Sequence, residues 1–557
     1  MKKFHLLLLS LLSGLFLTFA WTARGFPGLL FIGFIPLLCV EDDIFRNPAK
    51  YKRFSTLLYS YPAFFLWNGL TTWWICNSTG IGAILAIVLN ALFMSVIFNL
   101  FHFTRKKLQN DFAGYASLVL YWIAFEYLHL NWDLNWPWLN LGNGFGTYYK
   151  WVQWYEYTGA LGGTLWVLVA NLSLFFTIRP FIFQGYKCSN KPIITNGIIS
   201  VLWVLIPLAG SFIIYTNYRE TIRPVKLVVV QPNIDPYNEQ YVLPPKQVVG
   251  RIMDLARPQL DGSVNFLVAP ESAIQEEMWE NELSTFMSIH LLQDILVKYP
   301  DINILVGGST FRYFPKGEEP SSTARQFTDT HTYYDAYNTA ILINRLNGLQ
   351  LYHKSKLTPG VEILPSFRKF RWIEKFAINL GGTVGSLGTD KVRKVYKTVN
   401  TAEVSPAICY ESIFGEFFAE FVRNGAQVMI IITNDGWWGN TAGHRQHFAF
   451  ASLRAIETRR SIARSANTGI SAFINQRGDV LQQTEYWKPA VIKGTLNTNS
   501  KLTLYVREGD YIARAAVFLG GLLFLLSILF HFVSRKKKLP ATVKSDLLWK
   551  KKQQPGT

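Results

Sequence analysis

The segment Ser405-Pro406-Ala407-Ile408-Cys409-Tyr410-Glu411-Ser412 joins a short apolar run to a polar turn and then to a helical pattern. Residues 405–409 are too few for a helix and are typical of a strand, whereas the amphipathic pattern over 412–424 predicts a helix. A second such pattern covers 444–460. The other predicted strands are 226–231, 265–269, 302–306, 339–344 and 428–433. Strands that alternate with helices indicate an α/β sheet with covered faces.

Reactive side chains follow three of these strands. Glu271 comes just after 265–269, Lys354 follows the strand 339–344 and its Asn347-Gly348 turn, and Cys409 ends the strand 405–409. Ligand chemistry in such sheets collects outside the carboxyl ends of the strands. We therefore expect these three side chains to meet in one site.

These residue types suit acyl transfer. A thiol at a helix N-terminus near a lysine is expected to have a lowered pKa, which would make Cys409 a nucleophile near neutral pH. Glu271 can accept the thiol proton and return it to a leaving group. The Lys354 ammonium and the backbone N–H of Tyr410 can stabilise the oxyanion of a tetrahedral intermediate.

The rest of the chain has the composition of a membrane protein. Of its 557 residues, 50% are hydrophobic and only 17% are charged. A span needs about 20 apolar residues. About eight candidate spans are found: 4–20, 26–40, 56–76, 80–103, 112–130, 160–182, 195–215 and 511–533.

Loop charge predicts the orientation. With the N-terminus inside, only Arg24 and Lys150 among the basic residues of 1–215 fall outside. The basic residues that fall inside are Lys2, Lys3, Arg46, Lys50, Lys52, Arg53, Arg105, Lys106, Lys107, Arg179, Lys187 and Lys191. Under the positive-inside rule this bias puts both termini in the cytoplasm. The net charge of +18 thus orients a membrane protein and does not indicate a nucleic-acid partner.

Four regions follow from this pattern. They are a membrane region with seven candidate spans (1–215), an outer catalytic domain (216–510), a last span (511–534) and a basic tail (535–557). The sequence has neither a phosphate-binding glycine loop nor the Cys/His spacing of a zinc site, so no cofactor and no metal are predicted.

The order Glu271, Lys354, Cys409 resembles that of the nitrilase, or carbon–nitrogen hydrolase, superfamily. The membrane spans around it make the chain similar to the apolipoprotein N-acyltransferase family. Further pieces match in order: the proline-bearing segment 352–362, Cys409-Tyr410-Glu411, the segment 433–439, and the residues His447, Arg454, Glu457, Arg464 and 465–469.

The resemblance implies an α-β-β-α sandwich on the periplasmic face of a bacterial inner membrane. It implies transfer of an acyl chain from a phospholipid to the α-amine of a diacylglyceryl-modified apolipoprotein, through a thioester on the cysteine. Glu362 is expected to pair with Lys354, and Glu411 to support the cysteine loop. Tyr237, Trp437 and Trp438 are candidate substrate-binding residues.

Two positions depart from the family pattern. Where the family usually has Pro-Phe-Gly-Glu, this chain has Pro359-Gly360-Val361-Glu362, and where it often has a tryptophan after the Gln-Asn-Ile segment, this chain has Tyr237. The first departure keeps the glutamate, at position 362, and the second leaves a substrate role for Tyr237 open.

Several alternatives stay open. Lys356 is a rival to Lys354, and His447 and Arg454 are interpreted as structural. Residues 367–380, which mix aromatic and basic side chains, are a candidate lid that dips into the membrane interface. The rival functions are a membrane-tethered amidase, which would hydrolyse its thioester with water, and a non-catalytic membrane scaffold or transporter.

Overall fold

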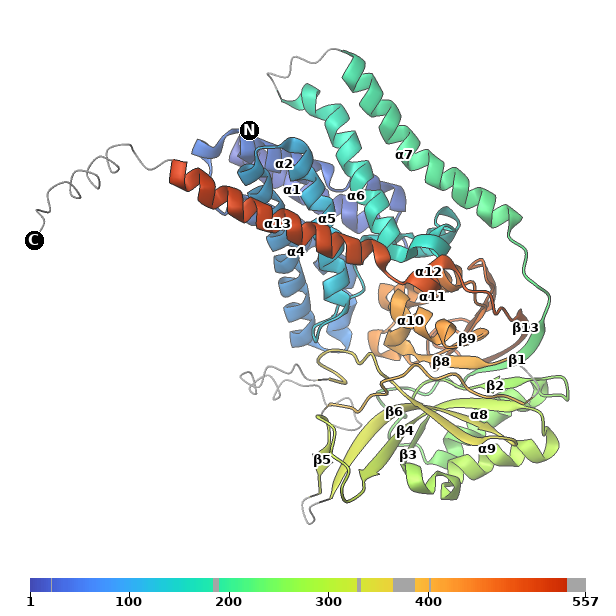
Figure 1. Ribbon diagram of the computed structural model, residues 1–557. Helices are drawn as coiled ribbons and strands as arrows, with labels where there is room; N and C mark the ends of the chain where they lie inside the picture. The colour runs from blue at the N-terminus through green and yellow to red at the C-terminus, as the bar shows by residue number, and fades with distance from the viewer. Residues whose placement is uncertain (22, 184–189, 328–331, 364–385, 400–401, 538–557) are drawn as a thin grey trace, which may run out of the picture.

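The structure is a computed structural model that describes residues 1–21, 23–183, 190–327, 332–363, 386–399 and 402–537, of which 190–192 and 533–537 are described by their backbone alone. The candidate lid at 367–380, Cys188 and most of the basic tail lie outside the described residues. Figure 1 shows a helical part on one side and an α/β part with two sheets on the other.

Helices lie at all eight positions of the predicted spans. They are α1 (Lys3–Phe19), α2 (Ile35–Arg46), α3 (Ser55–Thr72), α4 (Gly80–Leu108), α5 (Asp111–Leu130), α6 (Tyr155–Ile182), α7 (Asn190–Asn217) and α13 (Tyr511–Lys537). Among the described residues, four helices are long and apolar enough to cross a membrane: Gly80–Leu108, Tyr155–Ile182, Ile193–Asn217 and Tyr511–Phe532. The protein is therefore a membrane protein, and the count of about eight spans stays a prediction.

The second predicted span, 26–40, is wrong in its limits. A short 3₁₀ turn (Pro27–Phe31) precedes α2, which continues to Arg46 and carries three buried acidic residues. Arg105 Nη2 and Arg179 Nη2 lie 2.8 and 2.6 Å from Asp42 Oδ1. These two arginines were counted as cytoplasmic loop charges. They form a buried ion-pair cluster that joins α2, α4 and α6, because a buried cation needs a paired anion.

All six predicted strands are confirmed. The larger sheet has the order β13-β1-β2-β4-β6-β5, with β3 paired to β4 and β7 paired to β6; the smaller has the order β12-β11-β10-β9-β8. The strands are β1 (Pro224–Gln231), β2 (Phe266–Val268), β3 (Ile274–Trp279), β4 (Asn303–Phe314), β5 (Arg325–Gln326), β6 (Tyr333–Asn344), β7 (Gly348–His353), β8 (Val404–Ile408), β9 (Val428–Thr433), β10 (Ile462–Ala466), β11 (Ala472–Ile474), β12 (Val480–Gln483) and β13 (Ala490–Asn497).

The two sheets form the middle layers of an α-β-β-α sandwich. Alternate residues of β1 point to opposite faces. Val228 and Val230 pack with α8 (Pro245–Ala256) and α9 (Met287–Lys298), whereas Leu227 and Val229 belong to the core shared with the smaller sheet. The smaller sheet is covered by α10 (Gly415–Arg423) and α11 (Ala442–Thr458), and the short α12 (Leu504–Glu508) leads from the α/β part into α13. The predicted α/β fold is therefore confirmed.

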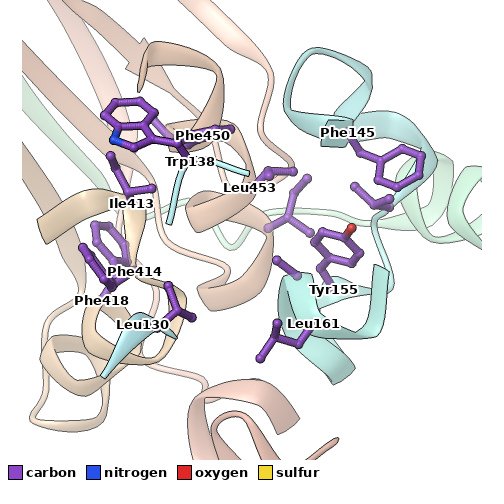
Figure 2. Close-up of a cluster of buried hydrophobic side chains, with 14 of the residues drawn as sticks. Leu130, Trp138, Phe145, Tyr155, Leu161, Ile413, Phe414, Phe418, Phe450 and Leu453 are labelled. Carbon is purple, nitrogen blue, oxygen red and sulfur yellow. The ribbon is translucent and has the colours of Figure 1, made fainter. Parts of the chain in front are cut away.

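The helical part and the α/β part share one hydrophobic core. Figure 2 shows that Leu130, Trp138, Phe145, Tyr155 and Leu161 from the helical part lie close to Ile413, Phe414, Phe418, Phe450 and Leu453 from the α/β part. Ile413 and Phe414 follow Cys409 within five residues. The turn that carries the cysteine is therefore pressed against the helices of the membrane region.

Candidate active site

Cys409 lies at the end of β8, where the chain turns sharply. Its φ is +50°, in the left-handed region that non-glycine residues rarely adopt. A 3₁₀ turn, Cys409–Ile413, begins at the cysteine itself, and α10 begins only at Gly415. Such strained backbone persists only where the surroundings hold it, and it is concentrated at functional sites.

The prediction of a lowered thiol pKa is wrong. Burial raises the pKa of the Cys409 thiol well above its usual range, and the carboxylate of Glu271 adds to the rise, while Lys354 opposes it without outweighing it. The helix that was expected to lower the pKa begins six residues later, and a single 3₁₀ turn has little dipole. The resting cysteine therefore holds its proton and needs a base.

Glu271, whose carboxylate acts on the pKa of the Cys409 thiol, is the predicted base. Its Oε1 accepts hydrogen bonds from Lys354 Nζ at 3.0 Å and from Asn338 Nδ2 at 2.8 Å. Its Oε2 accepts one from the backbone N–H of Asn434 at 2.9 Å. With both oxygens held, the carboxylate has one fixed orientation, as general acid–base work requires.

Lys354 joins two carboxylates. Its Nζ also donates to Glu362 Oε1 at 2.9 Å, and its side chain is only 2% exposed. Burial alone would lower the pKa of Lys354, but Glu271 and Glu362 raise it well above its usual range. The pKa of Glu362 is correspondingly lowered against the opposing effect of burial, chiefly by Lys354. The lysine is therefore a fixed cation, and the predicted pairing with Glu362 is confirmed.

Lys356, the rival lysine, points elsewhere. Its Nζ donates to the backbone oxygen of Leu130 at 3.0 Å, at the C-terminal end of α5, and lies 5.0 Å from the ring centroid of Phe414. Lys356 thus contacts the helical part, whereas Lys354 contacts both carboxylates.

Two asparagines of the site were missed by the sequence analysis. Asn338 Nδ2 also donates to Glu362 Oε1 at 3.1 Å, so this amide bridges the two carboxylates just as Lys354 does. Asn338 lies inside β6, one residue before the predicted start of that strand, and a buried asparagine in an apolar strand is the signal that could have found it. Asn434 contacts Glu271 through its backbone N–H, which no side-chain pattern in the sequence could have indicated.

Glu411 connects the lysine loop to the cysteine loop. It is fully buried, and its two oxygens accept four hydrogen bonds. Tyr352 Oη and the backbone N–H groups of Ser355 and Ile408 donate at 2.7, 2.6 and 2.7 Å, and that of Lys356 at 3.3 Å. This residue therefore fixes the distance between the strand ends that carry Lys354 and Cys409.

The candidate substrate-binding residues lie where the α/β part meets the helices. Tyr237 Oη donates to the backbone oxygen of Trp437 at 2.8 Å, and Asn77 Nδ2 donates to that of Trp438 at 2.8 Å. The ring of Trp438 lies 4.9 Å from that of Trp74, centroid to centroid. Their role in substrate binding stays a prediction, as does the supporting role of the Tyr410 backbone N–H. The hydroxyl of Tyr410 donates to Asn135 O at 3.1 Å.

A second buried cluster lies behind the nucleophile. Cys409 Sγ, a carboxylate oxygen of Asp435 and a ring nitrogen of His447 lie within 4.8 Å of one another, which is close enough to consider a metal site. However, Arg464 Nη2 lies 2.7 Å from Asp435 Oδ2 and 3.0 Å from His447 Nδ1. A guanidinium is always charged, so it opposes a metal cation at these donors.

Comparison with known proteins identifies both parts of the chain. Residues 13–173 match the family model of the apolipoprotein N-acyltransferase N-terminal domain, and residues 224–500 match that of carbon-nitrogen hydrolase. A protein of Chlorobaculum tepidum described as apolipoprotein N-acyltransferase is 28% identical over 93% of this chain and 96% of its own length. The chain belongs to the apolipoprotein N-acyltransferase family.

A Geobacter metallireducens protein with the same description is 26% identical over 92% of this chain and 93% of its own length. Among solved structures, Saccharomyces cerevisiae Nit3, of the nitrilase superfamily, is 16% identical over 49% of this chain and 90% of its own, with a TM-score of 0.34. The Chlorobaculum tepidum and Geobacter metallireducens proteins match 93% and 92% of this chain, so their similarity covers the membrane helices and the α/β domain together.

The departure from the family pattern at Pro359-Gly360-Val361 leaves the neighbouring carboxylate in place. Gly360 has a φ of +78° and its N–H donates to Ile363 O at 2.9 Å, while Glu362 Oε2 accepts from the N–H of Thr358 at 2.9 Å. The glycine supplies the left-handed turn that the loop needs. Glu362 therefore still reaches Lys354.

The Asp435 cluster predicts how stability depends on pH. Burial alone would raise the pKa of Asp435, but Arg464 and then His447 hold it well below its usual range. A lowered folded-state pKa adds stability above the unfolded value of about 3.9, and this stability is lost as the pH falls below that value. Thermal unfolding temperatures in detergent should therefore fall below about pH 4, and less steeply in Asp435→Asn.

At neutral pH the Asp435→Asn protein should be less stable by about 3–5 kcal/mol, because Arg464 loses the partner of a buried ion pair. Asp301→Asn, at an exposed position before β4, is the matched control and should change stability by less than about 0.5 kcal/mol. If the thermal unfolding temperature depended on pH equally in the wild type and in Asp435→Asn, the lowered pKa of Asp435 would be contradicted.

Proposed function

We infer that the protein is an apolipoprotein N-acyltransferase that moves a fatty acyl chain from a phospholipid to the α-amine of the N-terminal diacylglyceryl-cysteine of a lipoprotein. The observation that supports this most strongly is the joint position of the site residues. Glu271 and Lys354 are in direct contact, and the Cys409 turn packs against the membrane helices. An acyl-transfer centre therefore lies at the edge of the membrane region.

In the first step Glu271 takes the proton of the Cys409 thiol, and the sulfur attacks the carbonyl carbon of a phospholipid ester. The oxyanion that forms is stabilised by the Lys354 ammonium and the backbone N–H of Tyr410. As the carbon–oxygen bond breaks, Glu271 returns the proton to the departing lysophospholipid. A thioester on Cys409 remains.

In the second step the lipoprotein amine attacks the thioester carbonyl. Glu271 takes one proton from the attacking nitrogen and returns it to the cysteine sulfur when the carbon–sulfur bond breaks. The products are an N-acylated lipoprotein and the free thiol. The raised pKa of Cys409 fits both steps, because a thiol that keeps its proton needs a base in the first step and a basic thiolate readily takes a proton back in the second.

The position of the site suits two lipid substrates. Both donor and acceptor have acyl chains that are buried in the bilayer, and exposing such a chain to water costs about 0.8 kcal/mol per CH₂ group. A site next to the membrane helices avoids this cost.

Reporter fusions test the proposed inner-membrane topology, in which both termini are cytoplasmic and the catalytic domain is periplasmic. Because basic loops stay inside, a fusion after Gln109 should give a fluorescent cytoplasmic reporter and an inactive alkaline phosphatase. A fusion after Arg219 should give the reverse. Phosphatase activity at Gln109 would overturn the orientation.

One assay separates the acyltransferase from its rivals. The detergent-solubilised protein is incubated with phospholipid labelled in its acyl chain and with a diacylated lipopeptide. The expected product is labelled N-acyl lipopeptide in equal amount to lysophospholipid. Labelled free fatty acid alone would favour the amidase, and the lack of any acyl adduct on Cys409 by intact mass would favour the non-catalytic scaffold.

A further inference from the structure

The backbone carbonyl of Cys409 accepts hydrogen bonds from side chains behind the nucleophile. Ser412 Oγ donates to this oxygen at 2.7 Å, and His447 Nε2 lies 3.1 Å from it. His447 Nε2 is also 2.9 Å from Ser412 Oγ. Because the carbonyl and the serine oxygen both face the same ring nitrogen, His447 supports the carbonyl directly and through Ser412.

The proton on His447 is placed by its neighbours. A carbonyl oxygen only accepts, and the Ser412 hydroxyl gives its one hydrogen to that carbonyl, so Nε2 must carry a hydrogen. On the other edge of the ring, Nδ1 lies 2.9 Å from Asp435 Oδ1. Asp435 is itself held by Arg464 and by Thr433 Oγ1 at 2.8 Å. The imidazole is thus fixed from both edges, with its donor facing the cysteine turn.

The carbonyl of Cys409 and the N–H of Tyr410 are the two ends of one peptide group. Hydrogen bonds to the oxygen of a peptide polarise it and strengthen its N–H as a donor, by about 10–30% per bond. They also fix the direction of that N–H, since the group is planar. Hydrogen bonds to the Cys409 carbonyl therefore strengthen and orient the Tyr410 N–H on the opposite side of the peptide group.

We propose that His447, with Ser412, is a positioning residue that holds the Cys409–Tyr410 peptide and strengthens its N–H as the oxyanion donor of the acyl-transfer site. This inference rests on the proposed thioester mechanism. The left-handed φ of Cys409 is consistent with it, because such a conformation must be held by contacts. This role differs from a purely structural one, because it strengthens the hydrogen bond that the Tyr410 N–H donates to the carbonyl oxygen of the reacting substrate.

The chemistry assigns no proton transfer to His447. In each step a carbonyl carbon becomes tetrahedral, and its oxygen gains the electron pair and accepts a hydrogen bond from Tyr410 N–H. When the intermediate collapses, the pair reforms the double bond and the leaving group departs with the proton from Glu271. Both steps pass through such an oxyanion, so both depend on His447 to a similar degree.

The test uses His447→Ala and His447→Gln in the full-length protein. The C=O stretch of a ¹³C-labelled acyl thioester on Cys409, measured by infrared difference spectroscopy, should move to higher frequency in His447→Ala because the oxyanion donor is weaker. Both half-reactions should slow by about 10- to 100-fold with KM unchanged, somewhat less than the roughly 10²–10³-fold loss on deleting an oxyanion donor. His447→Gln, whose amide keeps an N–H donor, should recover most of the rate.

His444→Gln is the matched control. His444 lies on the same helix α11 and is equally buried, but it stacks on Tyr486 at 4.0 Å between ring centroids. The His444→Gln variant should leave the C=O stretching frequency of the acyl thioester unchanged. If His447→Ala does not fold, Ser412→Ala removes the other side-chain donor to the same carbonyl with little change of volume, and it should shift the frequency in the same direction.

The outcomes separate this inference from the proposed function. If the wild-type protein forms no acyl adduct, the proposed function fails and this inference fails with it. If the wild type is acylated but His447→Ala or Ser412→Ala has the same carbonyl frequency and rates, only this inference is overturned. Equal effects from His444→Gln and His447→Ala would also overturn it, because they would indicate a general effect on α11.

Discussion

Replacing Cys409 with alanine is expected to abolish both the acyl adduct and the transfer of the acyl chain. Deleting a covalent nucleophile typically lowers kcat by about 10⁶-fold, because what remains is binding and the oxyanion site alone. The measurement is intact-mass detection of the adduct after exposure to phospholipid, together with the rate of N-acyl lipopeptide formation. Both signals should fall to background.

Cys76→Ala is the matched control for this experiment. Cys76 is an exposed free cysteine in the 3₁₀ turn Trp73–Asn77 and has no predicted part in the chemistry. Its replacement should leave both adduct and transfer unchanged. Cys409→Ser, which keeps the shape of the side chain, should unfold at the wild-type temperature. Persistent N-acylation by Cys409→Ala would contradict the thioester mechanism.

Local patterns predicted six of the thirteen strands in the described part of the chain. The run 428–433 is apolar up to its last residue, Thr433, and becomes β9 with the same limits, because a strand buried on both faces is a near-continuous apolar run. Helix positions in the membrane region were also right, since long apolar runs have few alternatives. The predicted limits were wrong where a helix contains charged residues. In α2, Glu41 and Asp42 are paired with Arg105, which lies more than 60 positions away.

The members of the candidate site could be predicted, but not their electrostatics. Glu271, Lys354 and Cys409 were found because each follows a strand. The direction of the thiol pKa was wrong because burial and the nearby Glu271 carboxylate depend on tertiary contacts that the local sequence around Cys409 does not contain. His447 was interpreted as structural for the same reason: its contact with the Cys409 carbonyl joins residues 38 positions apart.

Replacing Lys354 with methionine has the second large expected effect, on activity and stability together. Without the ammonium, Glu271 and Glu362 would face each other through Asn338 with no cation between them. Removing one partner of a buried ion pair costs about 3–5 kcal/mol, so the thermal unfolding temperature should fall clearly. Transfer should fall by about 10³-fold, because both the oxyanion cation and the fixed orientation of the base are lost.

A second substitution separates these two effects. In the double variant Lys354→Met/Glu362→Gln one of the two facing carboxylates becomes neutral, so much of the lost stability should return while transfer stays low. Lys356→Met is the matched control: it loses one hydrogen bond from a charged donor to Leu130, worth about 1.5–3 kcal/mol, and should keep most of the activity. If the double variant regained transfer along with stability, Lys354 would serve only to balance charge, and the oxyanion would depend on the Tyr410 N–H alone. The Lys354 ammonium lies 3.0 Å from Glu271, the base, and 2.9 Å from Glu362. We therefore expect the Glu362→Gln change to restore stability without restoring transfer, because transfer depends on the ammonium and the base.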